Sequence, residues 1–162
     1  MTTSAPTCRA ITRDETVPLR HAVLRPDAPV DDVYFPSDET PGALHAGAFL
    51  DGELVAVGTI SPEDRDADAP GGAAPTLESD RGTAWRVRGM ATADWARSKG
   101  AGAGVLTACT EHARAAGGTI VWCNARIAAV PFYEREGWTL VSGEFDIPDV
   151  GPHFVMERRL DD

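Results

Sequence analysis

The alternation of apolar and polar positions is clearest in the first half of the chain. Two apolar runs, residues 45–50 and 54–60, are separated by Asp51-Gly52-Glu53. Asp-Gly between two such runs is the strongest short-range signal for a β-hairpin, because both residues tolerate the positive φ of a tight turn. The pattern therefore predicts an antiparallel pair of strands here.

The other regular elements follow from the same two periodicities. Strands are predicted over residues 8–11, 84–92, 119–123, 138–145 and 154–160, and helices over residues 14–24, 102–116 and 128–137. The run 119–123 is almost continuously apolar, as expected of a strand buried on both faces. In the second helix, Val105, Cys109, His112 and Ala116 fall along one stripe, which predicts its buried side.

Three segments lack a regular pattern. Residues 25–42 are rich in Pro and Asp and are expected to form an irregular connection with a short helical turn. Residues 61–83, dominated by Pro, Gly, Ala, Asp and Glu, predict a long mobile loop that is either an inert insertion or a substrate flap. Residues 146–153 are expected to be a loop that joins the last two strands.

The order β-α-β-β-β-α-β-α-β-β predicts an α/β fold with a mixed sheet. At 162 residues the chain is expected to be a single domain, residues 1–162. No apolar run approaches the roughly 18 residues that a membrane helix needs, and residues 1–8 do not resemble a signal peptide, so we expect a cytoplasmic protein without a membrane partner.

Charge and cysteine content narrow the function classes. The formal net charge is −10, which repels nucleic acid and favours the approach of a cationic amine, although acidity also simply supports solubility. The cysteines, Cys8, Cys109 and Cys123, are scattered and form no Cys-x-x-Cys pair. Such a set is typical of reduced thiols and not of a disulfide framework or a metal site, so we expect no metal.

A glycine-rich stretch, residues 97–104, lies between a predicted strand and a predicted helix. Its sequence is Arg-Ser-Lys-Gly-Ala-Gly-Ala-Gly. Small residues allow a ligand close to the backbone, and the N–H groups at a helix start attract phosphate oxygens. A tight turn that binds nothing is the alternative for such a stretch taken alone.

Two nucleotide-binding motifs do not fit this stretch. A P-loop requires Gly-Lys followed by Ser or Thr, and that string is absent from the sequence. A dinucleotide-binding fingerprint needs Gly-x-Gly-x-x-Gly after the first strand, whereas Gly104 comes one residue early and the stretch follows four predicted strands.

The stretch does resemble the acetyl-CoA loop of the GCN5-related N-acetyltransferase (GNAT) superfamily. Arg97, Gly100 and Gly102 match the family pattern Arg/Gln-x-x-Gly-x-Gly/Ala. Residues 88–92, Arg-Gly-Met-Ala-Thr, resemble the preceding family strand, whose backbone pairs with the pantetheine arm. The resemblance implies the GNAT fold, a mixed but mostly antiparallel central sheet of about 6–7 strands flanked by helices.

A second match lies downstream. Asn124, followed by Phe132-Tyr133 and then Gly137-Trp138, resembles the family's Asn and Phe/Leu-Tyr-x-x-x-Gly-Phe. Two motifs in the right order are far more specific than one. The ending Gly151-Pro152-His153-x-x-Met156 resembles that of small bacterial members of the family.

The resemblance implies an acetyl-CoA-dependent N-acetyltransferase that acts on a primary amine of a small molecule or protein. The implied acetyl-CoA-binding residues are Met90, Ala91, Thr92, Arg97, Ser98, Lys99, Gly100, Ala101, Gly102, Ala103, Asn124, Phe132 and Tyr133. Tyr133 is the implied general acid for the thiolate, the Met90 N–H polarises the carbonyl, and Asn124 binds the arm or orders water.

The general base is not assigned by the pattern. Many family members have a glutamate on the fourth strand, but residues 85–92 contain no carboxylate. His153 is the main candidate because imidazole titrates near neutral pH, and Glu78 and Asp80 are weaker ones. The missing carboxylate keeps two alternatives open, a non-catalytic acyl-CoA-binding or sensory module and a simple interaction domain. A homodimer is plausible by resemblance alone.

Overall fold

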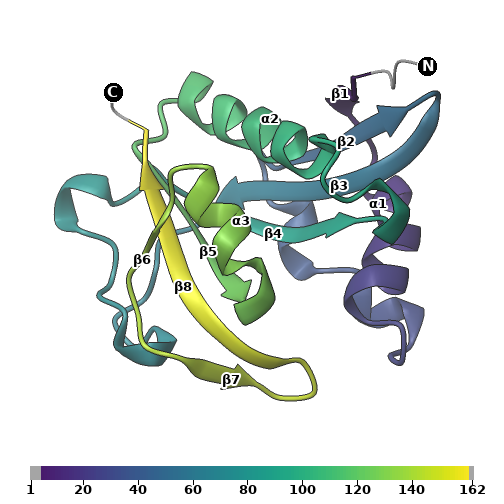
Figure 1. Ribbon diagram of the computed structural model, residues 1–162. Helices are drawn as coiled ribbons and strands as arrows, with labels where there is room; N and C mark the ends of the chain where they lie inside the picture. The colour runs from purple at the N-terminus through teal and green to yellow at the C-terminus, as the bar shows by residue number, and fades with distance from the viewer. Residues whose placement is uncertain (1–4, 161–162) are drawn as a thin grey trace. The chain divides into compact units, whose positions relative to one another are not determined.

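The computed structural model describes residues 5–160 and has a mixed α/β architecture (Figure 1). Its strands are β1 Thr7–Ala10, β2 Leu44–Leu50, β3 Glu53–Pro62, β4 Ala84–Thr92, β5 Ile120–Arg126, β6 Thr139–Leu140, β7 Phe145–Ile147 and β8 Gly151–Arg159. Its α-helices are α1 Arg13–Leu19, α2 Ala101–Ala115 and α3 Val130–Arg135.

The strand order is β1-β2-β3-β4-β5-β8-β6, with β7 also paired to β8. The β4–β5 pair is parallel, whereas the pairs β1–β2, β2–β3, β5–β8, β6–β8 and β7–β8 are antiparallel. The expected fold class, a mixed and mostly antiparallel sheet flanked by helices, is confirmed, with eight strands.

The chain forms two compact units. The first unit comprises Met1–Ser61 and Val87–His112, and the second comprises Pro62–Arg86 and Ala113–Asp162. In the first unit the predicted hairpin is confirmed: Asp51 and Gly52 have φ values of 51° and 85°, and Leu50 pairs with Glu53. The turn therefore uses the positive φ that Asp-Gly accommodates.

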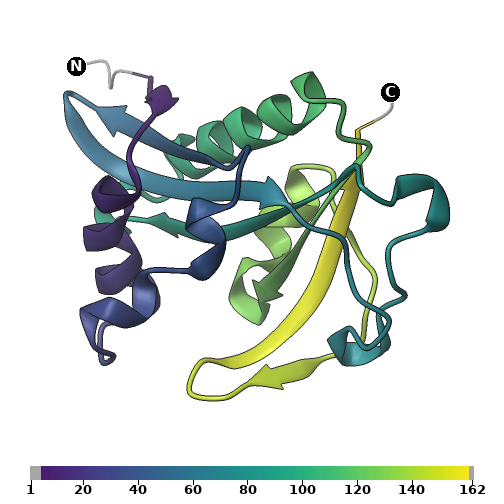
Figure 2. The same ribbon diagram turned by 180° about the vertical axis from the view of Figure 1, so that it is seen from behind.

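Helices cover both faces of the strands in the first unit (Figures 1 and 2). On one face, a side chain at Gly58 would collide with Met90 and with Val105 of α2. On the other face, the next residue, Thr59, accepts a hydrogen bond from Arg20, which directly follows α1. Successive residues of a strand point to opposite faces, so α2 and α1 pack on opposite sides of β3.

The helix predicted over residues 14–24 begins at Arg13 and has two parts. Thr12 caps it, since its hydroxyl accepts from the Glu15 N–H while the Glu15 carboxylate accepts from the Thr12 N–H. After α1 the chain continues as one π-helical turn, Arg20–Leu24. The irregular segment 25–42 contains two short 3₁₀ turns, Val30–Val33 and Pro36–Glu39.

The buried side of α2 differs from the predicted stripe. Val105 and Cys109 are buried as expected, but Leu106 and Ala113 complete the buried side, and Ala116 is exposed. His112 lies at the margin, where its Nε2 bonds the carbonyl of Gly42. The predicted i, i+4, i+7, i+11 stripe is about one position off the buried side, because the partners that bury a helix are set by tertiary packing.

In the second unit, β5 uses both of its faces. Ile120 and Trp122 pack with Ala73, Ala84 and Val155. The next residue, Cys123, points to the other face and hydrogen-bonds Tyr133 of α3. This alternation explains why residues 119–123 are almost entirely apolar.

The segment predicted as a mobile loop, residues 61–83, lies almost wholly in this unit and packs within it (Figure 2). It is irregular, as predicted, but Ala73 is buried and the side chains of Arg65, Thr76 and Asp80 are buried with hydrogen bonds. The expectation of a mobile loop rested on its low apolar content, and buried polar side chains take the place of apolar ones as anchors.

The chain after α3 also differs from the prediction. Residues 138–145 do not form one strand: β6 stops at Leu140, because the Ser142 hydroxyl accepts the N–H of Val155 and the Gly143 N–H bonds the carbonyl of Gly71. The expected loop 146–153 is instead part of a β7–β8 hairpin, closed by a bond from the Val150 N–H to the Ile147 carbonyl. Asp149 adopts a φ of 66° in that turn.

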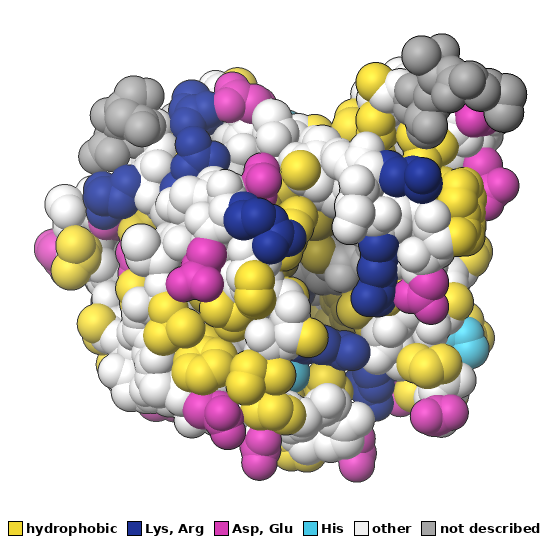
Figure 3. All heavy atoms as spheres, in the orientation of Figure 1, with side chains coloured by type: hydrophobic (Ala, Val, Ile, Leu, Met, Phe, Trp, Pro, Cys, Tyr) yellow, Lys and Arg dark blue, Asp and Glu magenta, His cyan; other side chains and the backbone are white. Residues whose placement is uncertain are grey.

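Within residues 5–160, no helix is long and apolar enough to cross a membrane. Although the net charge is −10, Lys and Arg side chains are interspersed with Asp and Glu on the face shown in Figure 3. The acidity that we expected to attract a cationic amine is therefore not concentrated on that face.

Candidate functional site

The start of α2 has the backbone geometry of an anion site. After a 3₁₀ turn at Asp94–Ala96, Ser98 and Gly100 take φ values of 66° and 86° and turn the chain into the helix. The first hydrogen bond along α2 runs from the Gly104 N–H to the Gly100 carbonyl, 3.0 Å. The N–H groups of Ala101, Gly102 and Ala103 precede that bond and therefore have no partner within the helix.

The glycines of this stretch have different roles. Gly100 has a positive φ, and a Cβ there would meet nothing within 4 Å, so the position is open to solvent and needs glycine for its conformation. Gly104 lies inside α2, in agreement with the helix predicted over residues 102–116, and a Cβ there would be 2.7 Å from Cys8 Sγ. Gly104 thus allows β1 to approach α2 and is not part of the loop that precedes the helix.

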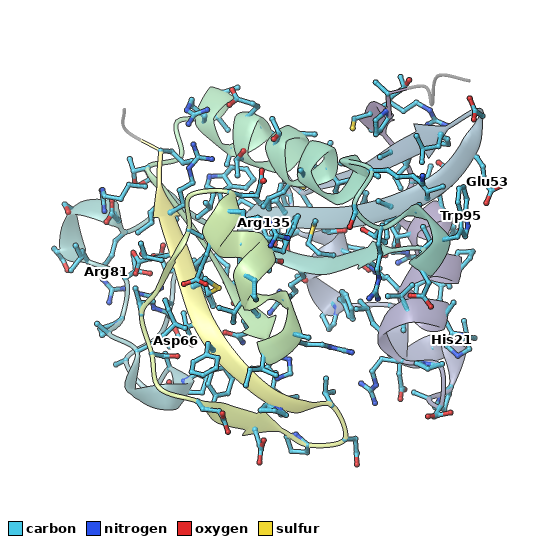
Figure 4. The ribbon with its side chains drawn as sticks, in the orientation of Figure 1. His21, Glu53, Asp66, Arg81, Trp95 and Arg135 are labelled. Carbon is cyan, nitrogen blue, oxygen red and sulfur yellow. The ribbon has the colours of Figure 1, made fainter. Side chains whose placement is uncertain are left out.

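The charged side chains of the stretch are exposed to solvent. Arg97 is exposed and forms an ion pair with Asp94, 3.1 Å, and both side chains are mostly in solvent. Such a pair is weak, so Arg97 can exchange Asp94 for a phosphate at little cost. Lys99 is also exposed. Between them and β4, the Trp95 side chain is 57% exposed and projects away from the strands (Figure 4).

The strand before the loop is interrupted at Gly89. This residue has a φ of 67° inside β4, which turns the peptide that leads to Met90. Ala91 is buried in a cluster with Ile11 and Val57, and the Met90 side chain packs at Gly58. The family pattern indicates Met90 to Thr92 as binding residues, but it does not predict the change of conformation at Gly89. An isolated glycine inside a strand is the signal that could have predicted it.

Asn124 of β5 carries an unsatisfied buried atom. Its Oδ1 is buried and has no hydrogen-bond partner within residues 5–160. A buried carbonyl oxygen without a partner costs about 1–3 kcal/mol, so such atoms usually await a ligand or water. This observation fits a ligand with an N–H or O–H donor, such as the amides of a pantetheine arm.

Tyr133 is buried in an aromatic cluster of α3. The ring centroids of Phe132 and Trp138 lie 5.2 and 5.1 Å from the ring of Tyr133. Its hydroxyl hydrogen-bonds the thiol of Cys123, whose pKa is raised to about 12 because burial outweighs that bond and the charge of Arg86. The Tyr133–Cys123 contact was not foreseen, since nothing local in the sequence links them.

His153 lies at the start of β8. Its Nδ1 donates to the carbonyl of Gly151, 2.7 Å, and its ring stacks on Phe145 with centroids 6.0 Å apart. That bond assigns the proton to Nδ1 and leaves Nε2 as the acceptor. Burial lowers the pKa of His153, and the charge of Arg126 lowers it further, so the ring is neutral at pH 7.

The β5–β8 register shows which of these residues share a face. Asn124 pairs with Val155 and Arg126 pairs with His153, and paired residues of an antiparallel ladder point to the same side. Asn124 and His153 therefore share one face, whereas Cys123, which Tyr133 contacts, points to the other. The structure brings Asn124 and His153 together but places Tyr133 across the sheet from them.

The weaker base candidates have structural roles or none. Asp80 is buried and accepts from Arg159 and Thr119, and these bonds, led by that to Arg159, lower its pKa. Glu78 is almost fully exposed and pairs with Arg81, 3.4 Å. Asp80 anchors the irregular segment to β8 and is not a base.

The fold and the open helix N-terminus fit an acyl-CoA-dependent transferase. A model of the Acetyltransferase (GNAT) family matches residues 8–138. The chain is 32% identical over 152 residues to the uncharacterized N-acetyltransferase YitI of Bacillus subtilis strain 168, covering 94% of this chain and 95% of that protein. The chain therefore belongs to the GNAT acetyltransferase family and is an N-acetyltransferase.

Solved structures agree with this fold. A putative N-acetyltransferase from Lactobacillus plantarum superposes with a TM-score of 0.70 at 23% identity, covering 97% of this chain and 99% of that one. YncA from Salmonella typhimurium, a putative acetyltransferase solved with acetyl-CoA, gives a TM-score of 0.67 at 14% identity, covering 98% and 96%.

Proposed function

We propose that the chain, as one catalytic domain, transfers an acetyl group from acetyl-CoA to a primary amine of a small molecule or a protein. The observation that carries the proposal is the set of N–H groups of Ala101, Gly102 and Ala103, which have no partner within helix α2. Together with the helix dipole they suit the pyrophosphate of CoA. Arg97, Ser98, Lys99 and Gly100 complete this loop.

The chemistry is a direct displacement. The neutral amine attacks the thioester carbonyl carbon, the C–S bond breaks, and the sulfur leaves as a thiolate that takes a proton from the Tyr133 hydroxyl. The amine gives up its extra proton to water or to a base, and the Met90 N–H stabilises the charge that develops on the carbonyl oxygen. Thr92 hydrogen-bonds the pantetheine arm, with Ala91 and Phe132 beside it, and Asn124, on the face of His153, binds the arm or orders water.

His153 is our candidate for the base, through its Nε2. Its neutral state at pH 7 supports this role, and its lowered pKa makes it effective only toward an amine that reaches the site largely deprotonated. The hydroxyl of Tyr133 hydrogen-bonds Cys123, which points to the face of the sheet opposite to that of His153. We therefore propose Tyr133 as the acid independently of which group is the base.

Replacing Gly102 tests the loop. Gly102→Glu is expected to place a carboxylate among the N–H groups of α2 and to weaken CoA binding by at least ~100-fold, measured by calorimetry. Ala115→Glu is the matched control, because Ala115 is exposed at the other end of the same helix and gains the same charge there. Normal CoA affinity in the Gly102 variant contradicts the proposal.

Tyr133→Phe tests the acid. Loss of the hydroxyl should lower turnover by about 10²-fold or more while leaving acetyl-CoA affinity nearly unchanged, since only the transition state uses the proton. Steady-state kinetics with an identified acceptor measures this. Unchanged turnover would remove Tyr133 from the acid role.

A further inference from the structure

A buried arginine lies directly against the interruption of β4. Arg20 is 0% exposed, and a Cβ at Gly89 would be 2.9 Å from its Nε and 3.4 Å from its Nη2. The Phe35 ring, whose Cε2 would be 3.2 Å from that Cβ, stacks on the guanidinium at 4.3 Å. The guanidinium and the ring therefore occupy the space that a side chain at residue 89 would need.

The terminal nitrogens of Arg20 are fully used. Nη1 donates to the Val33 carbonyl and to Asp38 Oδ2, at 2.9 and 2.7 Å, and Nη2 donates to Asp38 Oδ1 and to the Thr59 hydroxyl, both at 2.8 Å. This planar fork fixes the guanidinium in one orientation. Arg20 thereby joins the segment after α1, the second 3₁₀ turn and β3.

The network continues to His45. Because Thr59 accepts from Arg20, its own proton is directed to His45 Nδ1, 2.8 Å away, which assigns the imidazole proton to Nε2. His45 Nε2 then donates to the Asp38 carbonyl, 3.2 Å. Each member of the network is thus oriented by another, which is the condition for a rigid buried polar cluster.

One donor of Arg20 remains without a partner. Its Nε is buried and has no hydrogen bond within residues 5–160. It is also the Arg20 atom nearest to the site of the missing Gly89 side chain. A buried N–H without a partner needs a structural explanation, and the feature beside this one is Gly89. The guanidinium thus packs against the β4 backbone at Gly89 and limits the space open to that residue.

We propose that Arg20 is a positioning residue for acetyl transfer. It holds Gly89 in its left-handed conformation so that the following N–H, that of Met90, is aimed at the thioester carbonyl. This inference rests on the proposed function, because it assumes that the Met90 N–H meets that carbonyl. Arg20 itself touches neither the donor nor the acceptor.

Arg20→Lys tests the proposal, because lysine keeps the charge but loses the fork. We expect kcat to fall ~10²-fold, the effect of losing one aimed N–H donor, while KM for acetyl-CoA and CoA affinity change less than about twofold. Arg65→Lys is the matched control: Arg65 is a buried arginine of the second unit with its own carboxylate partner, and its replacement should leave kcat unchanged. Equal kcat values for Arg20→Lys and wild type, or equal losses in the two variants, overturn the proposal.

A spectroscopic measurement separates the loss of the aimed Met90 N–H from a general loss of native structure. S-acetonyl-CoA keeps the carbonyl but cannot transfer an acetyl group. The difference between the Met90 amide chemical shifts with S-acetonyl-CoA and with CoA therefore reports the hydrogen bond to the carbonyl without turnover. We expect a downfield shift of the Met90 amide proton in the wild type and in Arg65→Lys, and its loss in Arg20→Lys. A shift retained in Arg20→Lys overturns the positioning role alone, whereas a wild type that shows neither shift nor acetyl transfer overturns the proposed function as well.

A milder pair of variants covers the case in which Arg20→Lys does not fold. Thr59→Val removes the acceptor of Nη2, and Thr59→Ser keeps it. The valine variant should lose part of both kcat and the Met90 shift, and the serine variant should restore them. Identical behaviour of the two variants would contradict the proposal.

Discussion

The two compact units each bury one arginine against an aromatic ring, and the two arginines differ in what they hold. Arg20 of the first unit is fully buried, hydrogen-bonds Asp38 through both terminal nitrogens and lies against Gly89, the glycine of β4 with a positive φ. Arg65 of the second unit meets Glu157 through one nitrogen at 3.2 Å, bonds the Ala74 carbonyl and lies 5.7 Å from the centroid of the Trp122 ring. The same residue type thus shapes a strand in one unit and anchors an irregular segment in the other.

The difference shows how burial sets the importance of an ion pair. Asp38 has no exposed side-chain surface, and although burial raises its pKa, the hydrogen bonds and charge of Arg20 hold that pKa below its usual value. Glu157 is partly exposed and has water as an alternative partner. Breaking an ion pair that has no access to water strongly destabilises the fold, whereas an ion pair with access to water contributes little to stability.

The largest expected effect comes from Asp38→Asn. Leaving Arg20 charged and unpaired in a buried site should cost about 3–5 kcal/mol of unfolding free energy, measured by urea denaturation. Glu157→Gln is the control and should cost less than about 1 kcal/mol. Equal losses in the two variants would contradict the contrast drawn between the units.

Arg65→Met is expected to have an intermediate effect. The variant loses the bonds to Ala74 and Glu157 and should cost about 1–3 kcal/mol, with faster hydrogen exchange confined to the segment 61–83 and to β8. Arg81→Met, at an exposed side chain of the same segment (Figure 4), should change stability by no more than about 0.5 kcal/mol. Exchange that accelerates equally in β2 and β3 would show that Arg65 does not act locally.

The pH dependence of stability should be the smallest effect and should involve both units. Burial lowers the pKa of His45 and of His153, so the unfolded chain binds more protons than the folded chain below about pH 6.5. Their contribution to stability is complete above that pH and is lost as pH falls toward the folded-state values. His45→Gln with His153→Gln should flatten the decline in unfolding free energy between pH 7 and pH 5. If the double variant keeps the wild-type slope of unfolding free energy against pH, groups other than these two histidines cause that slope.

Features set by a few neighbouring residues could be predicted from the sequence. The Asp51-Gly52 turn, β4 and the start of α2 are local patterns, and the structure has them within one residue or so. Features that depend on contacts between distant residues could not. The bond of Ser142 to Val155, which ends β6 early, and the packing of Gly104 on Cys8 are of this kind.

The same distinction applies to the candidate site. The glycine pattern predicted the turn into α2, and the downstream motif singled out Asn124 and Tyr133, whose roles stay predictions. Arg20 and Asp38 are separated by 18 residues of mostly irregular chain, so no periodicity could link them. The opposite faces of Asn124 and Tyr133 also require the β5–β8 register, which only the structure supplies.

The most direct test of the central claim is thiol release from acetyl-CoA by the purified wild-type protein with a panel of amines, followed by mass spectrometry of the acceptors. The account predicts thiol release that depends on one class of primary amine, matched by a gain of one acetyl group on that amine. CoA binding without thiol release for any small amine or amino-terminal peptide would contradict it and would favour a non-catalytic acyl-CoA-binding module.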